Sequence, residues 1–348
     1  MRRVFLKIPG KIVISGDWAV VFDKSPCIAL ATPPVLEIEI KKKEGKEEVF
    51  FPQFSLRGKF SQKKFLWQKK LSQKEKEIFE VPRKALEVVF SYLKEIKKPL
   101  FSFEIKIKKK EGSGTSSALT LGLIKGILKF YKIKNKRKIL KLSLISHFLA
   151  QGEIGSGVDV ATSLYGGVIF YKRFKKEWLK ENLKKLSLKE IISKKWPGLY
   201  VKRLNFPSKV YFLFGFSKKR IPTIEIIKKV KKLKKGTQKS LEATLKEIGY
   251  VVRKLSYFWK KESPQKILEL LQKNASLLKK IEKETKIKIF TSLFKKAQKI
   301  AQDKICAIKT SGWGGGDVIF GVFLKKEDLK EVKKSWEKLG LFTLSFTK

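Results

Sequence analysis

Cysteine, histidine and methionine are almost absent from this chain of 348 residues, which contains two, one and one of them. Cys27 and Cys306 lie far apart and form no CxxC pair, which excludes a disulfide framework and a zinc site built on cysteine. The single histidine, His147, can build neither a catalytic triad nor a metal site with several histidines. We expect both cysteines to be small core residues and His147 to be packed in an apolar helix.

Acidic residues are scarce, because 32 Asp and Glu stand against 81 Lys and Arg and give a formal net charge of +49. Such a charge is typical of proteins that bind nucleic acid. The lysines are nevertheless spread along the whole chain, mostly on the polar faces of expected helices, and no arm or single tract concentrates them. We therefore expect no dedicated nucleic-acid site. A positive field would still attract a phosphorylated small-molecule substrate.

Long apolar runs are missing too, so we expect neither a membrane span nor a membrane partner. The basic N-terminal stretch is interrupted by Lys7, Pro9 and Lys11, which does not fit a signal peptide. Hydrophobic residues make up 43% of the chain, enough for a packed core. We expect a soluble cytoplasmic protein, and the sequence leaves open whether it is a monomer or a homodimer.

The order of apolar patterns predicts an α+β protein with two domains, 1–185 and 186–348. Each half reads as strands, then helices, then strands. The expected elements are short strands within 3–60 (one of them 18–22), a helix at 83–97, a strand at 101–108, helices at 118–132 and 137–150, a short helix and strand within 154–174, a solvated connector at 174–195, strands at 199–204 and 209–216, four helices within 222–303, strands at 305–310 and 318–324, a helix at 326–338 and a strand at 342–346.

A small, hydroxyl-rich loop leads into the helix expected at 118–132. The first amides of a helix have no partners within it and carry partial positive charge, so a flexible loop there can hold phosphate oxygens, and hydroxyls can also bind magnesium. An ordinary helix start with small residues would look similar, and the loop alone does not decide between the two. Its residues are Gly112, Ser113, Gly114, Thr115, Ser116 and Ser117.

Three further positions gain interest together with this loop. Lys11 follows an expected turn at Pro9-Gly10 and is expected to open a strand, where it is either a surface residue or is aimed at a polyphosphate. Asp159 follows a glycine turn at the start of a short helix. It is either a helix cap or a carboxylate near a reacting group. The segment 311–316 contains four glycines between two strands, more than a hairpin needs, which favours a backbone close to a ligand.

The combination and order of these motifs resemble the GHMP kinase family, most closely its phosphomevalonate kinase branch. The resemblance rests on the lysine-bearing first strand, "GSGTSSA", "GSGVDVATSLYGG", "WPGLYVKRLNFP" and "KTSGWGGGD". It implies a ribosomal-S5-like N-terminal domain, a ferredoxin-like C-terminal domain, and ATP with Mg²⁺ as cofactors. The implied reaction is phosphoryl transfer from ATP to 5-phosphomevalonate.

The resemblance also implies roles for single residues. Lys11 and Asp159 match the catalytic pair, and residues 112–117 match the phosphate-binding loop, in which Ser117 would help to hold Mg²⁺. The basic pair Lys172 and Arg173 would either meet the acceptor's phosphate or stay on the surface. The remaining positions expected on the acceptor side are Ser156, Gly157, Ser311, Gly312, Gly314 and Gly315.

The chain departs from the family pattern at three places. Thr115 stands where the loop usually ends in glycine, which is expected to restrict the backbone there. Asp17-Trp18 replaces a usual Glu-Tyr or Glu-His, and Trp313 replaces a small residue and is expected to narrow the acceptor pocket.

Two alternatives to phosphomevalonate phosphorylation stay open. One is another activity of this family, such as a mevalonate or sugar kinase or a diphosphomevalonate decarboxylase. The other is a nucleic-acid-binding protein on the same fold, motivated by the charge of +49. With a phosphate acceptor, which is largely deprotonated at neutral pH, we expect Asp159 to orient Lys11 and the acceptor; with an alcohol it would have to act as a base.

Overall fold

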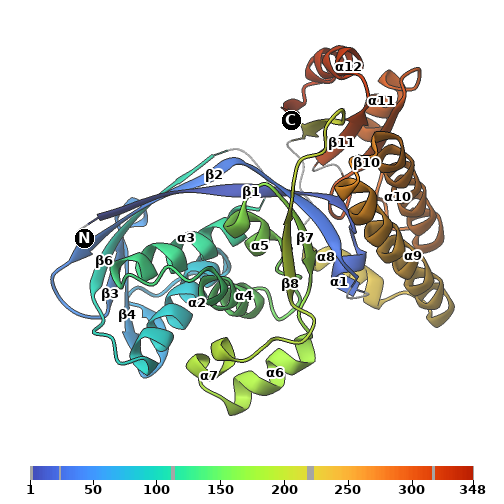
Figure 1. The fold of residues 1–348 in the computed structure, drawn as a ribbon. Coiled ribbons are helices and arrows are strands. Elements are labelled where there is room, and N and C mark those ends of the chain that lie inside the picture. Colours follow the sequence, from blue (N-terminus) through green and yellow to red (C-terminus); the bar gives the residue numbers. More distant parts are fainter. Residues whose placement is uncertain (1–2, 23–24, 111–113, 218–222, 316–317, 348) are drawn as a thin grey trace. The chain divides into compact units, whose positions relative to one another are not determined.

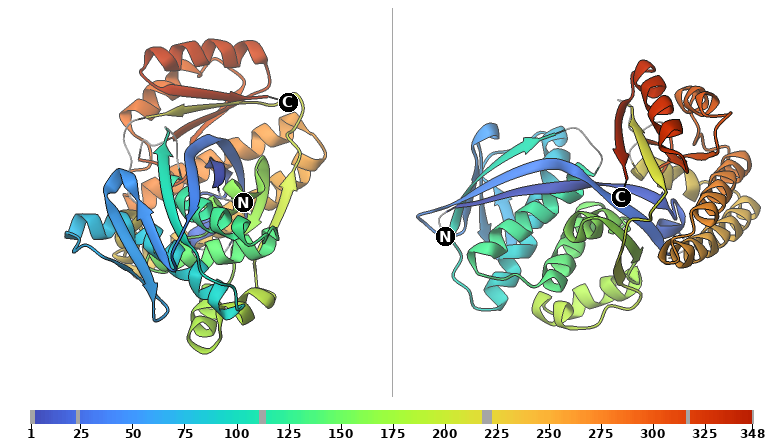
Figure 2. Two further views of the ribbon diagram at one scale, coloured as in Figure 1. Left: turned by 90° about the vertical axis from the view of Figure 1, so that its left-hand side faces the viewer. Right: turned by 45° about the horizontal axis from the view of Figure 1, so that its top comes forward.

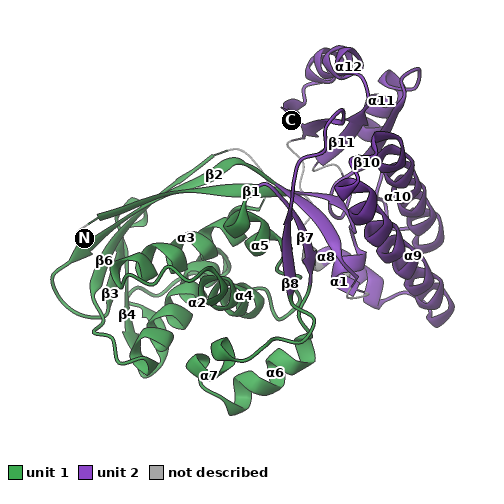
Figure 3. Ribbon diagram, viewed as in Figure 1, with its two compact units in different colours: residues 1–11, 31–166, 173–199 green, residues 12–30, 167–172, 200–348 purple. Residues whose placement is uncertain are grey.

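The structure is a computed structural model that describes residues 3–22, 25–110, 114–217, 223–315 and 318–347. Contacts within the chain divide it into two compact units (Figure 3). Unit 1 comprises residues 1–11, 31–166 and 173–199, and unit 2 comprises residues 12–30, 167–172 and 200–348. The units alternate along the sequence, so no single cut separates them. The boundary at 185/186 therefore does not part the compact units and, as a statement about family domains, stays a prediction.

Two long strands, β1 (Arg3–Ser15) and β2 (Cys27–Lys43), pair with each other and run through both units. β1 continues through Pro9 and Gly10, so the turn expected before Lys11 was wrong: Lys11 lies inside a strand. The separate strands expected within β2 are likewise one strand. Proline is compatible with a strand where its missing N–H is not needed for the ladder.

The sheet of unit 1 places β6 beside β2, followed by β3, β4 and β5. β6 is antiparallel to β2, with Leu36 opposite Lys109, and parallel to β3. Leu36, Ile38 and Ile40 are buried while the alternate residues are more exposed, as the sequence pattern predicts for a half-exposed strand. The remaining bounds are β3 (Glu48–Phe51), a short 3-10 helix (Pro52–Phe54), β4 (Leu56–Ser61), β5 (Lys64–Trp67) and β6 (Ser102–Lys109).

Helices cover one face of this sheet (Figures 1 and 2). Two glycines four residues apart in α3 bring its backbone close to the strands, because a Cβ at Gly122 would lie 2.2 Å from Ile38 Cδ1 and one at Gly126 2.5 Å from Ile40 Cδ1. The helices of this layer are α2 (Gln73–Glu95), α3 (Thr115–Phe130), α4 (Lys136–Ala150) and α5 (Val158–Tyr165).

The segment expected to be a solvated connector contains two helices of unit 1, so that expectation was wrong. They are α6 (Lys176–Lys185) and α7 (Leu188–Ser193). α7 begins with a capping box in which Ser187 accepts from the Glu190 amide, and Glu190 accepts from the Ser187 amide. Buried Leu179, Ile191 and Ile192 attach these helices to the unit, although lysines dominate their sequence.

Unit 2 contains residues 27–30 of β2, paired with β7, which pairs with β8. The residues 18–22, expected to form a strand, instead contain a one-turn helix, α1. A separate antiparallel sheet has the order β10-β11-β9-β12. The bounds are α1 (Ala19–Phe22), β7 (Val168–Lys172), β8 (Tyr200–Leu204), β9 (Tyr211–Phe216), β10 (Cys306–Thr310), β11 (Val318–Phe323) and β12 (Phe342–Phe346).

The described residues between β9 and β10 form four helices, as expected, and a further helix connects β11 to β12. The resulting strand order is that of a ferredoxin-like βαββαβ unit. Its core contains the buried rings of Phe212, Phe214, Phe320 and Trp336. The helices are α8 (Thr223–Lys231), α9 (Lys235–Lys260), α10 (Pro264–Thr285), α11 (Ser292–Ile300) and α12 (Lys326–Lys338). Among the described helices, none is both long enough and apolar enough to cross a bilayer.

We expect opposite effects from leucine at two helical glycines. Gly122→Leu should lower the free energy of unfolding by about 2–3 kcal/mol, because the new side chain overlaps Ile38 and Ile8. The control is Gly236→Leu in α9, at an exposed position where a Cβ would have no atom within 4 Å. This control should raise the free energy of unfolding by up to about 1 kcal/mol through helix propensity. Urea denaturation of both variants checks this, and equal changes would contradict close packing at Gly122.

Candidate active site

Lys11 and Asp159 meet in unit 1. The Lys11 Nζ lies 3.4 Å from Asp159 Oδ1, and the two side chains are 16% and 28% exposed. Lys11 comes from strand β1 and Asp159 from the first turn of α5. An ammonium and a carboxylate are thus held together where a polar ligand can reach them.

The position of Asp159 follows from how α5 begins. Its N-terminal cap is Gly157 at φ +79°, a left-handed conformation that favours glycine. A carboxylate in the first turn is stabilised by the helix dipole. Ser163 Oγ donates to the Pro9 carbonyl at 2.7 Å, which ties α5 to β1 two residues before Lys11. Ser156, also predicted as a site residue, is buried immediately before this helix.

The start of α3 adjoins the same lysine. Its cap residue Gly114 has φ +89°, and a Cβ there would lie 3.5 Å from Lys11 Cγ. Because glycine has no side chain, it offers no cap to the first amides of α3, in contrast to Asn135, which caps α4. The structure therefore brings Lys11, Asp159 and the beginning of α3 together. Gly112 and Ser113 lie outside the described residues.

The hydroxyl residues of the loop occupy the first turn of α3. Thr115 is the first helical residue, so the left-handed conformation falls on Gly114, and the restriction expected from the Thr115 side chain is avoided. Ser116 is exposed, whereas Ser117 is buried and its Oγ donates to the Gly114 carbonyl at 2.8 Å. The helical N–H groups at 115–117 remain directed towards the entry of the helix.

The two residues of the basic pair at the end of β7 differ in their exposure to solvent. Lys172 is exposed, while Arg173 is only 3% exposed. The surface alternative is therefore wrong for Arg173, because its guanidinium is enclosed. A role of either residue toward the acceptor stays a prediction.

The third glycine turn joins β10 to β11 in unit 2. Gly312, Gly314 and Gly315 have φ between +75° and +79°, which explains why this turn needs several glycines. Ser311 Oγ accepts the Val13 N–H at 2.9 Å, on the part of β1 that belongs to the same unit. A Cβ at Gly314 would lie 2.5 Å from Ile289 Cγ2, so the backbone there is closely packed.

Sequence reasoning missed Lys309, which forms a buried ion pair with Asp17 beside this turn. Asp17 drew attention only as a departure from the family pattern. A lysine within the apolar strand ICAIKT was a signal that could have indicated an internal partner, because unpaired lysines are almost never fully buried.

His147 is buried in α4, as predicted. Burial lowers the pKa of its imidazole below the ordinary 6.5; the negative charge of Asp159 opposes this shift and the positive charge of Lys11 adds to it. The ring is therefore neutral at physiological pH. Its electrostatic coupling to both residues indicates that it belongs to the surroundings of the candidate site.

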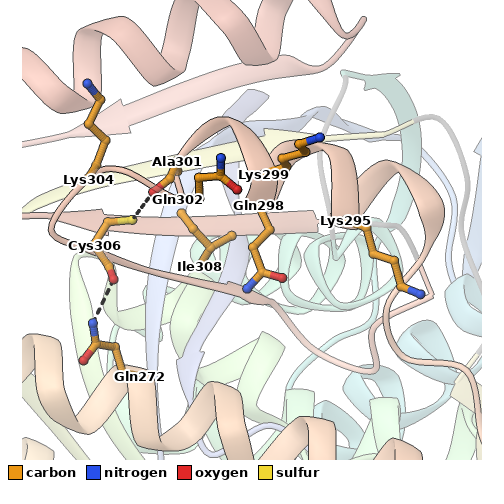
Figure 4. A pocket seen from close by; sticks show the side chains of 9 residues that line it. All are labelled: Gln272, Lys295, Gln298, Lys299, Ala301, Gln302, Lys304, Cys306 and Ile308. Carbon is orange, nitrogen blue, oxygen red and sulfur yellow. Dashed lines mark hydrogen bonds between the residues drawn. The ribbon is translucent and has the colours of Figure 1, made fainter.

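A pocket of about 560 Å³ lies elsewhere in unit 2, between α10, α11 and β10 (Figure 4). None of the described site residues predicted from the sequence lines it. Burial raises the pKa of its Cys306 thiol to about 11, so this cysteine is not a nucleophile at neutral pH. The lining residues are Gln272, Lys295, Gln298, Lys299, Ala301, Gln302, Lys304, Cys306 and Ile308.

This chain is similar in sequence to known proteins. Residues 80–167 match the family model described as GHMP kinases N terminal domain. A phosphomevalonate kinase of Saccharolobus solfataricus is 28% identical over 241 residues, which cover 68% of this chain and 67% of that protein. A phosphomevalonate kinase of a Streptomyces species is 21% identical, with 99% of this chain and 97% of that protein covered.

The fold has solved counterparts. The Streptococcus pneumoniae phosphomevalonate kinase, solved with phosphomevalonate and AMPPNP, superposes with a TM-score of 0.81 at 18% identity, covering 99% of this chain and 100% of that one. At that identity the likeness concerns the fold alone. Together these findings confirm the predicted GHMP kinase resemblance and its α+β fold.

We expect His147 to make the folded protein sensitive to mild acid. Because the folded-state pKa is lowered, the unfolded chain binds the proton first, and the free energy of unfolding falls as pH decreases below 6.5. One proton contributes at most about 1.4 kcal/mol per pH unit. Urea denaturation of the wild type and His147→Gln at pH 7.5 and 5.5 measures this part, and the variant should lose less stability. Equal losses would contradict a buried neutral imidazole.

Proposed function

We propose that this chain is a GHMP kinase that transfers the γ-phosphoryl group of ATP to 5-phosphomevalonate, giving 5-diphosphomevalonate and ADP. The observation that carries the proposal is the meeting of Lys11, Asp159 and the glycine-capped start of α3. The two curated relatives named phosphomevalonate kinase support this acceptor over others in the family.

The nucleotide's phosphates would bind at the entry of α3. The N–H groups of residues 115–117 and the helix dipole favour anions there, and Gly114 allows a close approach because it has no side chain. Gly112, Ser113, Thr115 and Ser116 would complete the loop around the triphosphate.

Lys11 and Asp159 would act on the group being transferred. The bond from the γ-phosphorus to the ADP oxygen breaks as a bond to an oxygen of the acceptor's phosphate forms, so positioning and neutralisation of charge are the main demands. The acceptor's second pKa is near about 6, by analogy with phosphorylated side chains, and little deprotonation is needed at neutral pH. Lys11 would neutralise charge between the phosphates, and Asp159 would orient Lys11 and the acceptor.

Magnesium fits the residues present as an ion held chiefly by the nucleotide. The described residues contain no cluster of three His, Cys, Asp or Glu side chains that could hold a metal, and Mg²⁺ typically binds substrate phosphates with few protein ligands. The Ser117 hydroxyl donates its proton to Gly114 and retains oxygen lone pairs for a cation. Bound there, Mg²⁺ would offset negative charge on the phosphates.

Each of the two remaining glycine motifs supplies groups that would suit a phosphorylated acceptor. Ser156 and Gly157 precede the helix of Asp159, and Ser311, Gly312, Gly314 and Gly315 supply a turn of closely spaced amides. Lys172 and Arg173 would add positive charge for the acceptor's own phosphate. The excess of lysine supports attraction of two anionic substrates, and the cytoplasm is where we expect this reaction.

A coupled assay of ADP release tests the function. Turnover should be fastest with 5-phosphomevalonate, compared with mevalonate, galactose, homoserine and diphosphomevalonate. Preference for another acceptor would move the protein to another branch of the family. Absence of turnover with all acceptors, together with RNA or DNA binding that weakens steeply with salt, would favour the nucleic-acid alternative.

We expect Lys11→Met to reduce kcat by about 100-fold or more, because charge stabilisation of the transferring group is lost. Asp159→Asn should lower kcat by about tenfold, since asparagine keeps the shape and a hydrogen-bonding group. If Asp159 were a general base, its loss would lower kcat by up to about 10⁴-fold. The exposed Lys7 of β1 provides the control, and Lys7→Met should leave kcat unchanged. A collapse of several orders of magnitude in Asp159→Asn would assign it the role of base.

A further inference from the structure

Asp17 and Lys309 form an ion pair in the interior of unit 2. Lys309 Nζ lies 2.6 Å from Asp17 Oδ2, and neither side chain has any exposed surface. The ammonium also donates to the Thr310 carbonyl at 2.6 Å and lies 5.7 Å from the centre of the Phe320 ring. Burial lowers the pKa of Lys309, and the charge of Asp17 opposes that shift.

The second oxygen of Asp17 reaches the glycine turn 311–315. Asp17 Oδ1 accepts the N–H of Gly312 at 2.6 Å, across 295 positions of sequence. Gly312 has φ +75°, so it is the first of the left-handed glycines that shape the turn. One carboxylate therefore holds a backbone amide with one oxygen and a lysine with the other.

Other contacts hold the ends of this turn. Ser311 N–H donates to the Val318 carbonyl at 3.0 Å, and Gly315 N–H donates to the Ile289 carbonyl at 2.7 Å. Ile289 and Phe290 in turn donate their amides to Glu282. Asp17 acts between these fixed ends, at the point where the backbone first enters the left-handed region.

Stability alone does not account for a pair of this kind. A fully buried ion pair loses much of its attraction to desolvation, and apolar residues of similar volume often serve the fold equally well. The ion pair does orient a functional group, because Lys309 fixes the orientation of the Asp17 carboxylate, which accepts the N–H of Gly312.

We infer that Asp17, with Lys309 as its counter-ion, is a positioning residue for the glycine turn 311–315 and thereby sets the affinity for the phosphorylated acceptor. The inference rests on the proposed function, in which this turn binds the acceptor. It concerns the acceptor and not ATP, whose phosphates are assigned to the start of α3.

Two double variants separate positioning from stability. Asp17→Asn with Lys309→Gln removes both charges but keeps an oxygen for the Gly312 N–H; Asp17→Leu with Lys309→Met removes both charges and that oxygen. The KM for 5-phosphomevalonate should stay within about threefold of the wild type in the polar double variant and rise about tenfold or more in the apolar one. The KM for ATP should change by less than about twofold in both.

Equal acceptor KM values in the two folded double variants, whether normal or raised, would overturn the inference. Hydrogen exchange of the 309–315 peptide in the full chain adds a measurement without turnover. The amides of this peptide should stay protected in the wild type and in the polar double variant. They should exchange about tenfold faster or more in the apolar double variant. If the apolar double variant does not fold, Asp17→Ala takes its place. Unchanged exchange would also overturn it.

The two proposals fail in different ways. Without turnover of 5-phosphomevalonate by the wild type the proposed function fails, while the exchange measurement still tests whether Asp17 holds the turn. With normal wild-type turnover and no difference between the double variants, only the role of Asp17 fails.

Discussion

The proposed chemistry depends on the contact between Lys11 and Asp159. The geometry of this contact is fixed by the neighbouring strand and helices and not by the attraction between the two side chains. Both side chains are partly exposed, so solvent screens their attraction and the pair adds little stability by itself. The supporting bond is that from Ser163 to the Pro9 carbonyl, which fixes helix α5 on strand β1. Gly114 then lets α3 begin beside the same lysine. Three elements thus deliver a cation, a carboxylate and the first amides of a helix to one place.

Local patterns predicted much of this arrangement. The glycine turns, the helix after residue 114 and the four helices before β10 were visible because each depends on nearby residues. The uninterrupted course of β1 through Pro9 was not predictable from the sequence, because pairing with β2 overrides the local preference for a turn. The bond between Asp17 and Lys309 joins positions 292 apart, and only the tertiary fold makes them neighbours. Local sequence therefore indicated the chemistry of the site better than its internal support.

Two departures from the family pattern prove to be neighbours. The rings of Trp18 and Trp313 lie 5.3 Å apart in an edge-to-face contact, and Phe22 lies 5.6 Å from Trp313. Edge-to-face aromatic pairs are stabilising beyond the area they bury. Trp18 itself has φ +59°, which is costly for a residue with a large side chain. The bulky residue at 313 is thus packed against the other unusual position, next to the residue that holds Gly312.

The alternation of the two units along the chain has a consequence for biosynthesis. The polypeptide crosses between them at 11/12, 30/31, 166/167, 172/173 and 199/200. Residues 12–30 emerge from the ribosome well before residues 200–348, which supply the rest of unit 2. Until then, apolar side chains such as Ile14 and Ile28 lack most of their native contacts. Contacts of such sequence separation form slowly, and exposed apolar segments invite aggregation meanwhile. The native core of unit 2 is therefore completed only after residues 200–348 have been synthesised.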